Sequence, residues 1–215
     1  MDVFVLNQEN SIANQFLLEL RDREIQKDRM RFRNNLVRLG EIMAYEISKK
    51  LNYQPISFQT PLKAADSFQL QQQPILITVL RAGLPYFQGF LNYFDQSDSG
   101  FIGAYRKEDQ EELTIQLDYL ATPSLANRDV ILIDPMLATG NSIIRSVTAL
   151  LKQGTPSTIY VASLVASPEG IANLSSQLKV RCSLFTFSVD EKLNKEFYIV
   201  PGLGDAGDLS FGEKV

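Results

Sequence analysis

The nine residues 134–142 constrain the fold of this chain more than any other stretch. They follow Asp129–Ile133, an apolar run rich in β-branched residues that is typical of a buried parallel strand. After them, apolar residues recur with helical period, and Gly154 stands where such a helix would end. The spacing therefore predicts a strand, a tight polar loop and a helix in immediate succession.

The loop between this strand and this helix carries groups that suit a sugar phosphate. It consists of Asp134, Pro135, Met136, Leu137, Ala138, Thr139, Gly140, Asn141 and Ser142. A helix N-terminus has unpaired N–H groups and a positive dipole end, so it binds phosphate, and Gly140 lets the backbone approach the anion. The hydroxyls of Thr139 and Ser142 add donors, while Asp134 can accept hydrogen bonds from sugar hydroxyls. The alternative is an ordinary capped helix with Asn141 or Ser142 as N-cap.

Several function classes are excluded or disfavoured by composition. The chain contains no histidine, which excludes an imidazole base, the Ser-His-Asp triad and most zinc hydrolases. A net charge of −4 argues against a nucleic-acid-binding surface. No apolar run is long enough to span a membrane, and Met1–Asn10 lacks the layout of a signal peptide. Cys182, the only cysteine, lies in an apolar run and is expected to be a buried, inert thiol. These features are those of a cytoplasmic protein.

The rest of the chain predicts one α/β domain over residues 1–215, with an N-terminal arm over residues 1–28. Helices are predicted near Ser11–Asp22, over 29–51, over Leu84–Phe94 and from Ser167 onward, where Ser167 is the N-cap and Pro168 follows it. Buried strands are predicted at Pro74–Leu80, Ser99–Tyr105, Thr158–Val165 and Leu178–Val189, with a loop at Asn52–Gln73. Strands that alternate with helices predict a doubly wound, mainly parallel sheet flanked by helices. The arginines at 29, 31, 33 and 38 indicate a solvated helix face, the alternative being a subunit contact or an anionic effector site.

Two further arginines follow predicted strands. Arg81 stands at the carboxyl edge of the sheet, where open α/β sheets bind ligands, and its fork can hold two phosphate oxygens. Arg106 follows the strand 99–105, and the charged and alternating residues 107–120 predict a β-hairpin over the site. From pattern alone, the alternatives are a surface arginine in a βα loop and a solvated surface excursion.

The C-terminal stretch is rich in turn-forming residues. Residues 199–212 contain Pro201 and the glycines at 202, 204, 207 and 212, so we expect no regular element there. Ordered glycine-rich loops turn tightly or bring backbone onto a ligand, whereas a frayed tail is the alternative.

Three of these stretches resemble one enzyme family. Val130–Ser142 resembles the 5-phosphoribosyl-1-diphosphate (PRPP) motif of the type I phosphoribosyltransferases. Its residues Asp-Pro-Met-Leu-Ala-Thr-Gly are those of the uracil phosphoribosyltransferases. Val79–Gly83 resembles the pyrophosphate loop of that family, and Tyr198–Asp208 resembles its uracil-binding loop. The chain departs from the family pattern at Pro135, where most type I relatives have a second acid. It departs also at Asn141, Leu209 and Ala121, which replace a usual glycine, arginine and basic residue.

The resemblance implies a type I phosphoribosyltransferase fold with a flexible β-hairpin loop and a small C-terminal hood, residues 190–215. It implies that uracil and PRPP react to give UMP and diphosphate, in a homodimer or higher homo-oligomer. The implied catalytic residues are Arg81, Arg106 and Asp205. The implied PRPP contacts are these three together with residues 134–142. The implied uracil contacts are Tyr198, Ile199, Gly204, Asp205 and Ala206.

The resemblance also implies Mg²⁺ as cofactor, held mainly through the diphosphate of PRPP without a direct protein ligand set. GTP is a candidate effector, because it activates some members. Two other functions stay open: a phosphoribosyltransferase for another base, and a non-catalytic nucleotide sensor, in one form an RNA-binding regulator of pyrimidine genes. The intact loop at Ile199–Asp208 argues against the first, and the acidic balance argues against RNA.

Overall fold

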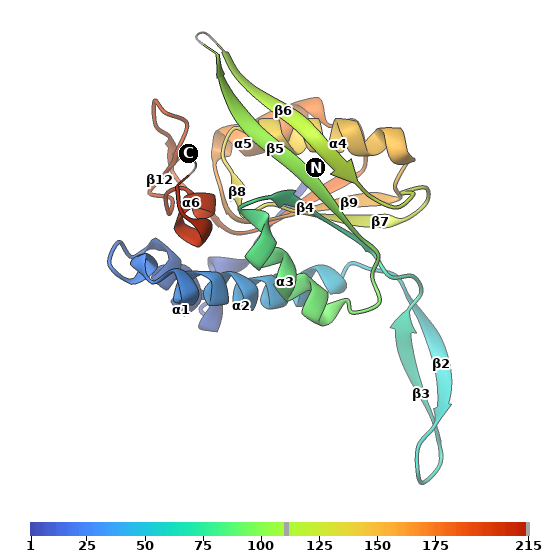
Figure 1. The fold of residues 1–215 in the computed structure, drawn as a ribbon. Coiled ribbons are helices and arrows are strands. Elements are labelled where there is room, and N and C mark those ends of the chain that lie inside the picture. Colours follow the sequence, from blue (N-terminus) through green and yellow to red (C-terminus); the bar gives the residue numbers. More distant parts are fainter. Residues whose placement is uncertain (110–111, 214–215) are drawn as a thin grey trace.

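The computed structural model describes residues 1–109 and 112–213, and the side chains of residues 104–118 lie outside this description. Its helices are α1 (Ile12–Arg21), α2 (Arg29–Ser48), α3 (Gly83–Tyr93), α4 (Asn141–Leu150), α5 (Pro168–Gln177) and α6 (Ala206–Phe211). Its strands are β1 (Asp2–Val5), β2 (Tyr53–Gln59), β3 (Ala64–Leu70), β4 (Ile75–Leu80), β5 (Ser99–Asp109), β6 (Glu112–Ala121), β7 (Asp129–Ile133), β8 (Met136–Leu137), β9 (Thr158–Ala166), β10 (Cys182–Val189), β11 (Lys192–Leu193) and β12 (Ile199–Val200). Figure 1 shows their arrangement.

The central sheet has the strand order β1-β10-β9-β7-β4-β5-β6, and β8 pairs with β9. Every pair in it is parallel except β5 with β6. Helices α2 and α3 cover one face of the sheet and α4 and α5 cover the other (Figure 1). The predicted doubly wound, mainly parallel sheet flanked by helices is therefore confirmed.

The strands β4, β7 and β9 are mostly apolar and are buried along most of their length, because helices cover both faces of the sheet. Successive residues of β7 point to opposite faces, so Ile131 and Ile133 pack on the α2 and α3 side. Val130 and Leu132 pack on the side of α4 and α5. This two-sided burial fixes the strand ends from which the loops at Arg81 and Asp134 begin.

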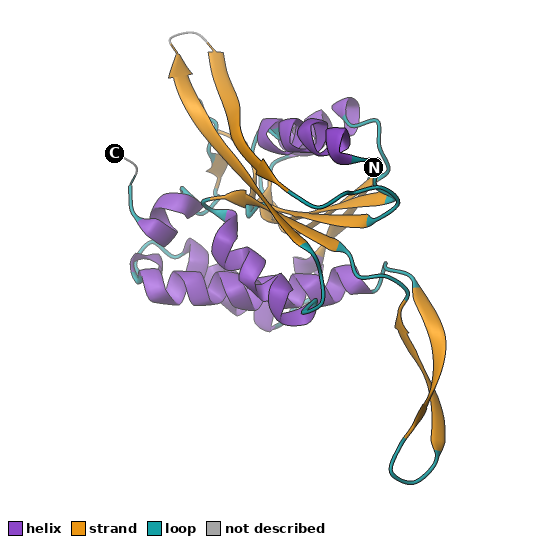
Figure 2. Cartoon of the chain, turned by 45° about the vertical axis from the view of Figure 1, so that its right-hand side comes forward, coloured by secondary structure: helices purple, strands orange, loops and turns teal. Residues whose placement is uncertain are grey.

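The predicted loop at Asn52–Gln73 is wrong, because the chain there forms the hairpin β2–β3. Figure 2 shows this hairpin projecting away from the rest of the molecule. Pro55 and Pro61 hid it from sequence reasoning, yet Pro55 is tolerated in a two-stranded ribbon because its strand needs no donor toward the solvent side. Its apolar side chains are open to solvent, with Leu62 94% and Phe68 72% exposed.

The N-terminal arm contains the predicted helix, as α1, and also a strand that we did not predict. β1 adds to the edge of the sheet beside β10, with Asp2 opposite Ser183. A run of four residues is too short to carry a periodic signal, so only its partner makes it a strand. The long helix predicted over 29–51 ends at Ser48 instead, and the strand predicted from Leu178 begins at Cys182. Burial raises the pKa of the Cys182 thiol to about 12, as expected for an inert cysteine.

The C-terminal stretch contains regular structure where none was predicted. β12 pairs with β11, and α6 follows directly after Asp205. Gly204 and Gly212, both with positive φ, lie outside the two ends of α6 rather than inside it. The glycines thus delimit a short helix, which is why their density misled the prediction. Within the described part of the chain, no helix is long and apolar enough to cross a bilayer.

Candidate functional site

The loops that begin at Arg81 and Asp134 leave the sheet from adjacent strands. β4 and β7 pair in parallel, with Thr78 opposite Ile133. The next strand after β4 lies on one side of it, and β7 and β9 lie on the other, so the strand order reverses direction here. Ligands of open α/β sheets bind outside the carboxyl ends of strands at such a point.

The loop 134–142 makes a tight turn onto α4. Gly140 is the N-cap, with φ of 79°, and the side chain of Thr139 accepts a hydrogen bond from the Asn141 amide at 3.4 Å. The alternative, in which Asn141 or Ser142 is the N-cap, is therefore wrong, because the left-handed turn at Gly140 starts the helix one residue earlier. The backbone N–H groups at the start of α4 face away from the helix, as an anion site requires.

Helix α5 supports this loop from behind, an arrangement that sequence reasoning missed. The Ser167 hydroxyl, fully buried, donates to the Ala138 carbonyl at 2.6 Å. The Asn173 amide donates to the Thr139 carbonyl at 2.8 Å and to the Asn141 side chain at 3.0 Å. Ser167 is also the N-cap of α5, as predicted. A capping signal identified the residue, but nothing local indicated that the same hydroxyl binds the loop.

Two glycines allow α5 to approach the loop this closely. A Cβ on Gly170 would clash with the Ala138 carbonyl and lie 3.0 Å from the Leu137 carbonyl. A Cβ on Gly140 would lie 2.5 Å from the Leu174 side chain. The loop and α5 are therefore in backbone-to-backbone contact, which leaves the loop little freedom.

Arg81 lies at the start of the neighbouring loop and contacts the C-terminal stretch. Its Nη2 donates to Asp208 Oδ1 at 3.1 Å and to the Gly212 carbonyl at 3.2 Å. The side chains of this ion pair are 40% and 35% exposed, so the guanidinium is accessible to a ligand. Gly207 lies near the same loop, since a Cβ on it would be 3.8 Å from the Ala82 Cβ. The C-terminal stretch thus lies beside the Arg81 loop.

The predicted base-contacting residues surround the start of α6. Ile199 and Ala206 are buried, whereas Gly204 is exposed and Tyr198 is 42% exposed. Asp205 is the N-cap of α6, and its Oδ1 accepts from the amides of Gly207 at 2.8 Å and Asp208 at 3.0 Å.

The remaining predicted residues of the loop 134–142 are placed as follows. The carbonyl of Pro135 accepts from the Leu164 amide at 2.9 Å, and Met136 and Leu137 form β8 against β9. Asp134 Oδ1 accepts from the Met136 amide at 3.3 Å. Ser142 lies in the first turn of α4. Arg106 lies in β5, but its side chain belongs to the part outside the description.

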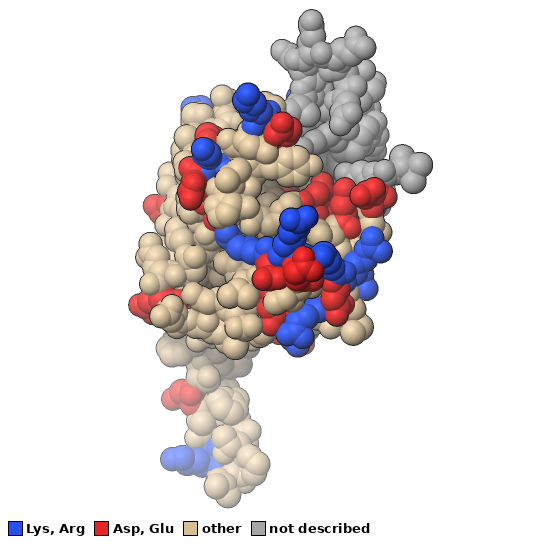
Figure 3. All heavy atoms as spheres, turned by 90° about the vertical axis from the view of Figure 1, so that its left-hand side faces the viewer, with Lys and Arg blue, Asp and Glu red and all other residues tan. Residues whose placement is uncertain are grey.

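Two cavities have contrasting positions. One of about 450 Å³ is lined by Gly204, Asp205 and Asp208, together with Arg29, and borders the predicted base-contacting residues. Figure 3 shows the neighbouring surface, where acidic and basic side chains are interspersed rather than gathered in one basic field.

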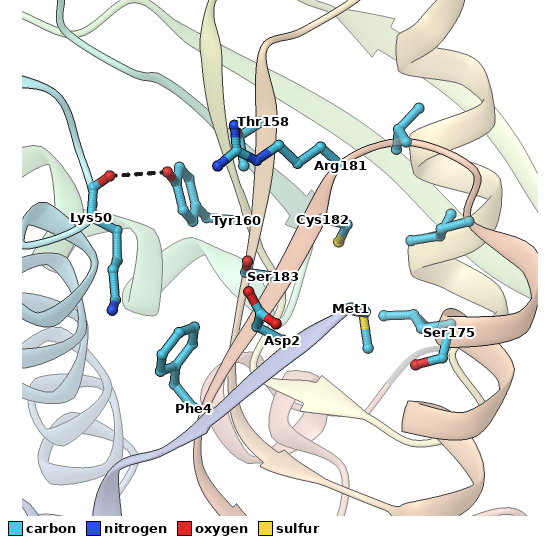
Figure 4. Close-up of a pocket in the computed structure, with 13 residues that line it drawn as sticks. Met1, Asp2, Phe4, Lys50, Thr158, Tyr160, Ser175, Arg181, Cys182 and Ser183 are labelled. Carbon is cyan, nitrogen blue, oxygen red and sulfur yellow. Dashed lines mark hydrogen bonds between the residues drawn. The ribbon is translucent and has the colours of Figure 1, made fainter.

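The other cavity, of about 400 Å³, lies at the amino ends of β9 and β10 and is drawn in Figure 4. Lys50, Tyr160 and Arg181 are among its lining residues, and the Tyr160 hydroxyl donates to the Lys50 carbonyl at 3.2 Å. It opens on the edge of the sheet opposite to Arg81 and Asp134, so it is not part of the candidate site.

A protein-built metal centre is not seen in the described side chains, which contain no group of three or more His, Cys, Asp or Glu able to hold a metal ion. Asp134 and Asp205 are therefore single carboxylates at the edge of the site. They are suited to contact a ligand-bound cation rather than to bind a bare one.

Comparison with known proteins agrees with this geometry. The family model of uracil phosphoribosyltransferase matches residues 7–213. Uracil phosphoribosyltransferase of Porphyromonas gingivalis is 44% identical with full coverage of both chains (100% and 100%), and that of Pyrococcus furiosus is 35% identical, covering 94% of this chain and 86% of its own.

Solved structures give the same result for the fold. The AQ2163 protein from Aquifex aeolicus superposes with a TM-score of 0.87 at 29% identity, covering 99% of each chain. A hypoxanthine-guanine phosphoribosyltransferase from Bacillus anthracis has a TM-score of 0.50 at 13% identity, covering 74% of this chain and 81% of its own, and shows the shared fold alone. This chain belongs to the uracil phosphoribosyltransferase family.

Proposed function

We propose that this chain is an enzyme that transfers the 5-phosphoribosyl group of PRPP to uracil, giving UMP and diphosphate in pyrimidine salvage. The observation that carries the proposal is the meeting of the Arg81 loop and the loop 134–142 at the adjoining ends of β4 and β7. A helix N-terminus beside an arginine fork suits the two phosphate groups of one sugar. The relatives carry the name of this enzyme, which favours catalysis over a sensor that only binds nucleotide.

PRPP is held, in this proposal, by residues 134–142 together with Arg81, Arg106 and Asp205. Residues 136–142 wrap the 5-phosphate through the amides at the start of α4, and Asp134 accepts hydrogen bonds from the ribose hydroxyls. The contacts from Ser167 and Asn173 support a loop that is rigid before substrate arrives. A preformed loop loses little conformational entropy on binding, which leaves more of the binding energy for affinity.

Departure of the diphosphate is assisted by Arg81 and Arg106. The anomeric carbon passes through a state with oxocarbenium character while negative charge grows on the leaving group. A guanidinium fork stabilises that charge more in the transition state than in the ground state. Arg81 has to exchange Asp208 and the Gly212 carbonyl for diphosphate oxygens, an exchange that its exposure permits.

Uracil is recognised by Tyr198, Ile199, Gly204, Asp205 and Ala206. Uracil has an edge of alternating acceptor, donor and acceptor, which backbone N–H and C=O groups can match. Cytosine has a different donor pattern and would leave buried polar groups unpaired. The uracil nitrogen attacks from the face opposite the diphosphate. Because the chain has no histidine, positioning and charge stabilisation carry most of the rate.

Mg²⁺ is the proposed cofactor, held mainly by the diphosphate of PRPP. Asp134 and Asp205 supply hard oxygen donors that suit Mg²⁺ through water or the ribose. When bound, the ion neutralises charge on the diphosphate. Chelation with excess EDTA is expected to abolish turnover, and added Mg²⁺ is expected to restore it. Full turnover in EDTA would remove Mg²⁺ from the proposal.

We further propose one catalytic domain in a homodimer or higher oligomer, working in the cytoplasm. An isolated two-stranded hairpin is marginal in water, and Leu62 and Phe68 expose apolar surface on β2–β3, which fits contact with a second copy. Phe68→Asp should shift the sedimentation coefficient toward the monomer, and Gln69→Asp on the opposite side of the strand should not. GTP is the proposed effector, tested by adding it to the assay below.

The test of the function is an assay with uracil, PRPP and Mg²⁺ in which UMP is followed by chromatography. Cytosine, hypoxanthine and orotate serve as parallel bases. UMP formation with uracil alone supports the proposal. Absence of product with every base, combined with thermal stabilisation by UMP, would indicate a binding protein instead.

The arginine is tested with Arg81→Ala, which should lower kcat and raise KM for PRPP together, a loss of about 100-fold or more in kcat/KM. Arg145→Ala on α4 is the control. Unchanged kinetics in Arg81→Ala would contradict the assigned role.

A further inference from the structure

A buried carboxylate outside the proposed site is linked to the base-contacting loop. Asp190 directly follows β10, and its side chain is 3% exposed. It accepts four hydrogen bonds. Arg21 donates to both oxygens at 2.9 and 3.0 Å, Ser188 Oγ donates to Oδ1 at 2.8 Å, and the Gly202 amide donates to Oδ2 at 2.7 Å.

The charge of the Asp190 carboxylate is balanced by Arg21, and both of its oxygens accept hydrogen bonds. A buried carboxylate is costly unless it is paired and hydrogen-bonded. Burial alone would raise the pKa of Asp190, but the bonds from Arg21, Ser188 and Gly202 outweigh it and hold the pKa below its usual value. Asp190 is therefore ionised at neutral pH and each oxygen accepts two donors, one from Arg21 and one from the β10 or Gly202 side.

One of the four donors belongs to the proposed base-contacting loop. Gly202 lies between Ile199 and Gly204, and its φ of 60° makes a turn that a side chain would disturb, since a Cβ there would clash with the Ile199 carbonyl. The Asp190 carboxylate holds the amide of this turn. The backbone of Asp190 is itself fixed to the sheet, because its amide donates to the Ala166 carbonyl at the end of β9 at 2.9 Å. The carboxylate thus connects the turn to a rigid strand end.

Arg21 brings the N-terminal arm into this arrangement. It is the last residue of α1, and its two bonds to Asp190 span 169 residues of sequence. A bidentate arginine fixes both the position and the plane of a carboxylate, which a lysine does not. The orientation of the Gly202 turn therefore depends on a guanidinium supplied from the other end of the chain.

We infer that Arg21 and Asp190 are positioning residues for uracil recognition: the pair sets the turn at Gly202, and with it the backbone groups at Ile199 and Gly204 that meet the base. Neither residue contacts a substrate. The inference rests on the proposed function. Most of the proposed PRPP contacts lie in loop 134–142, which α5 supports separately, so loss of the pair should weaken base binding far more than PRPP binding.

The test compares Asp190→Asn and Arg21→Lys with the wild type in steady-state kinetics. One substrate is varied while the other is saturating. KM for uracil is expected to rise at least about tenfold in Asp190→Asn, with KM for PRPP changed less than about twofold. Discrimination against cytosine should fall in parallel. Arg21→Lys keeps the charge and loses the fork, so its KM for uracil should lie between the wild type and Asp190→Asn.

Two controls separate positioning from stability. Glu19→Gln breaks another buried carboxylate network on α1, with Arg31 and Asn35, that has no bond to the base loop. It should lower the melting temperature without moving KM for uracil. Glu191→Gln changes the exposed neighbour of Asp190 and should alter neither quantity. If Asp190→Asn does not fold, Arg21→Lys decides alone. A rise in its KM for uracil without a rise in its KM for PRPP supports the inference.

The outcomes are distinguishable. A wild-type protein that makes no UMP from uracil would overturn the proposed function. An active wild type whose variants show an unchanged KM for uracil, or equal changes for uracil and PRPP, would overturn the positioning inference alone.

Discussion

The two proposed substrate loops are held by different kinds of interaction. Neutral hydrogen bonds from α5 hold the loop 134–142, as in the bond from Ser167 to Ala138, only 29 residues away in sequence. An ionised pair holds the base-contacting loop, and its members Arg21 and Asp190 come from opposite ends of the chain. The loop 134–142 is therefore held by residues close to it in sequence, whereas the base-contacting loop depends on a pair of residues from opposite ends of the chain.

The largest expected effect comes from disturbing the contact between α5 and the loop 134–142. In Gly170→Ala, the new methyl group would clash with the Ala138 carbonyl, so the loop 134–142 or α5 has to shift. A displacement near 1 Å can cost about 100-fold in rate, and we expect that loss in kcat/KM for PRPP. Steady-state kinetics measure it, with Ser176→Ala on the exposed side of α5 as control. A variant with wild-type kcat/KM would show that the close approach is dispensable.

Acid should act on the second buried carboxylate network of the N-terminal arm, that of Glu19 on α1. A hydrogen bond from Arg31, with others from Gln15 and Asn35, lowers the pKa of Glu19 to about 2 from 4.5. Because the folded pKa is the lower one, this stabilisation is fully present above pH 4.5 and is lost as the pH falls toward 2. At neutral pH we expect Glu19→Gln to lower the free energy of unfolding by about 1–3 kcal/mol.

Urea unfolding of the wild type and Glu19→Gln at falling pH measures this effect. The gap between the two proteins should shrink below pH 4.5. A gap that stays constant down to pH 3 would contradict the assigned pKa.

Ser167→Ala should have a smaller effect, since it removes neutral hydrogen bonds that hold the loop 134–142. The substitution removes the N-cap of α5 and the donor to Ala138, which we expect to lower the free energy of unfolding by about 1 kcal/mol. In contrast to Glu19→Gln, the loss should depend only weakly on pH between 7 and 3, because the Ser167 hydroxyl makes only a minor contribution to the lowered pKa of Glu169. Urea unfolding checks both statements, and Ser167→Thr, which keeps the hydroxyl, should recover part of the loss.

The smallest expected effect concerns the contact between the Arg81 loop and the C-terminal stretch. Asp208→Asn removes an ion pair with Arg81 that is partly exposed on both sides, so stability should change by less than about 1 kcal/mol. Arg81 then has one competitor fewer for the diphosphate, and KM for PRPP should fall slightly. Thermal melts and kinetics at low and high salt measure the two quantities. A rise in KM would mean that Asp208 orients Arg81 rather than competes with it.

The sequence predicted the parts of the molecule that rest on local signals. The strand 129–133, the tight loop between it and the next helix, and the capping residue Ser167 each carry a short-range pattern, and the structure contains all of them. Distant partners were not predictable in the same way. The bond from Ser167 to Ala138 and that from Arg21 to Asp190 appear only when separate elements are brought together.

The elements that were predicted wrongly or missed are those whose structure depends on distant partners. The hairpin β2–β3 alternates weakly and contains prolines, while β1 is defined only by pairing with β10. The short helix α6 is hidden among glycines whose role is to end it rather than to prevent it. In each case the tertiary partner, rather than intrinsic propensity, decided the local structure.

The pairing of β1 with β10 has a consequence for the time course of biosynthesis. Asp2 faces Ser183, so β1 is made long before β10 and can pair only after β10 has been made. Until then, β1 and the guanidinium of Arg21 lack their partners in β10 and at Asp190, although α1 can already pack on α2. The base-contacting turn is therefore set only after β1 and Arg21, which are made early, have met β10 and Asp190, which are made later.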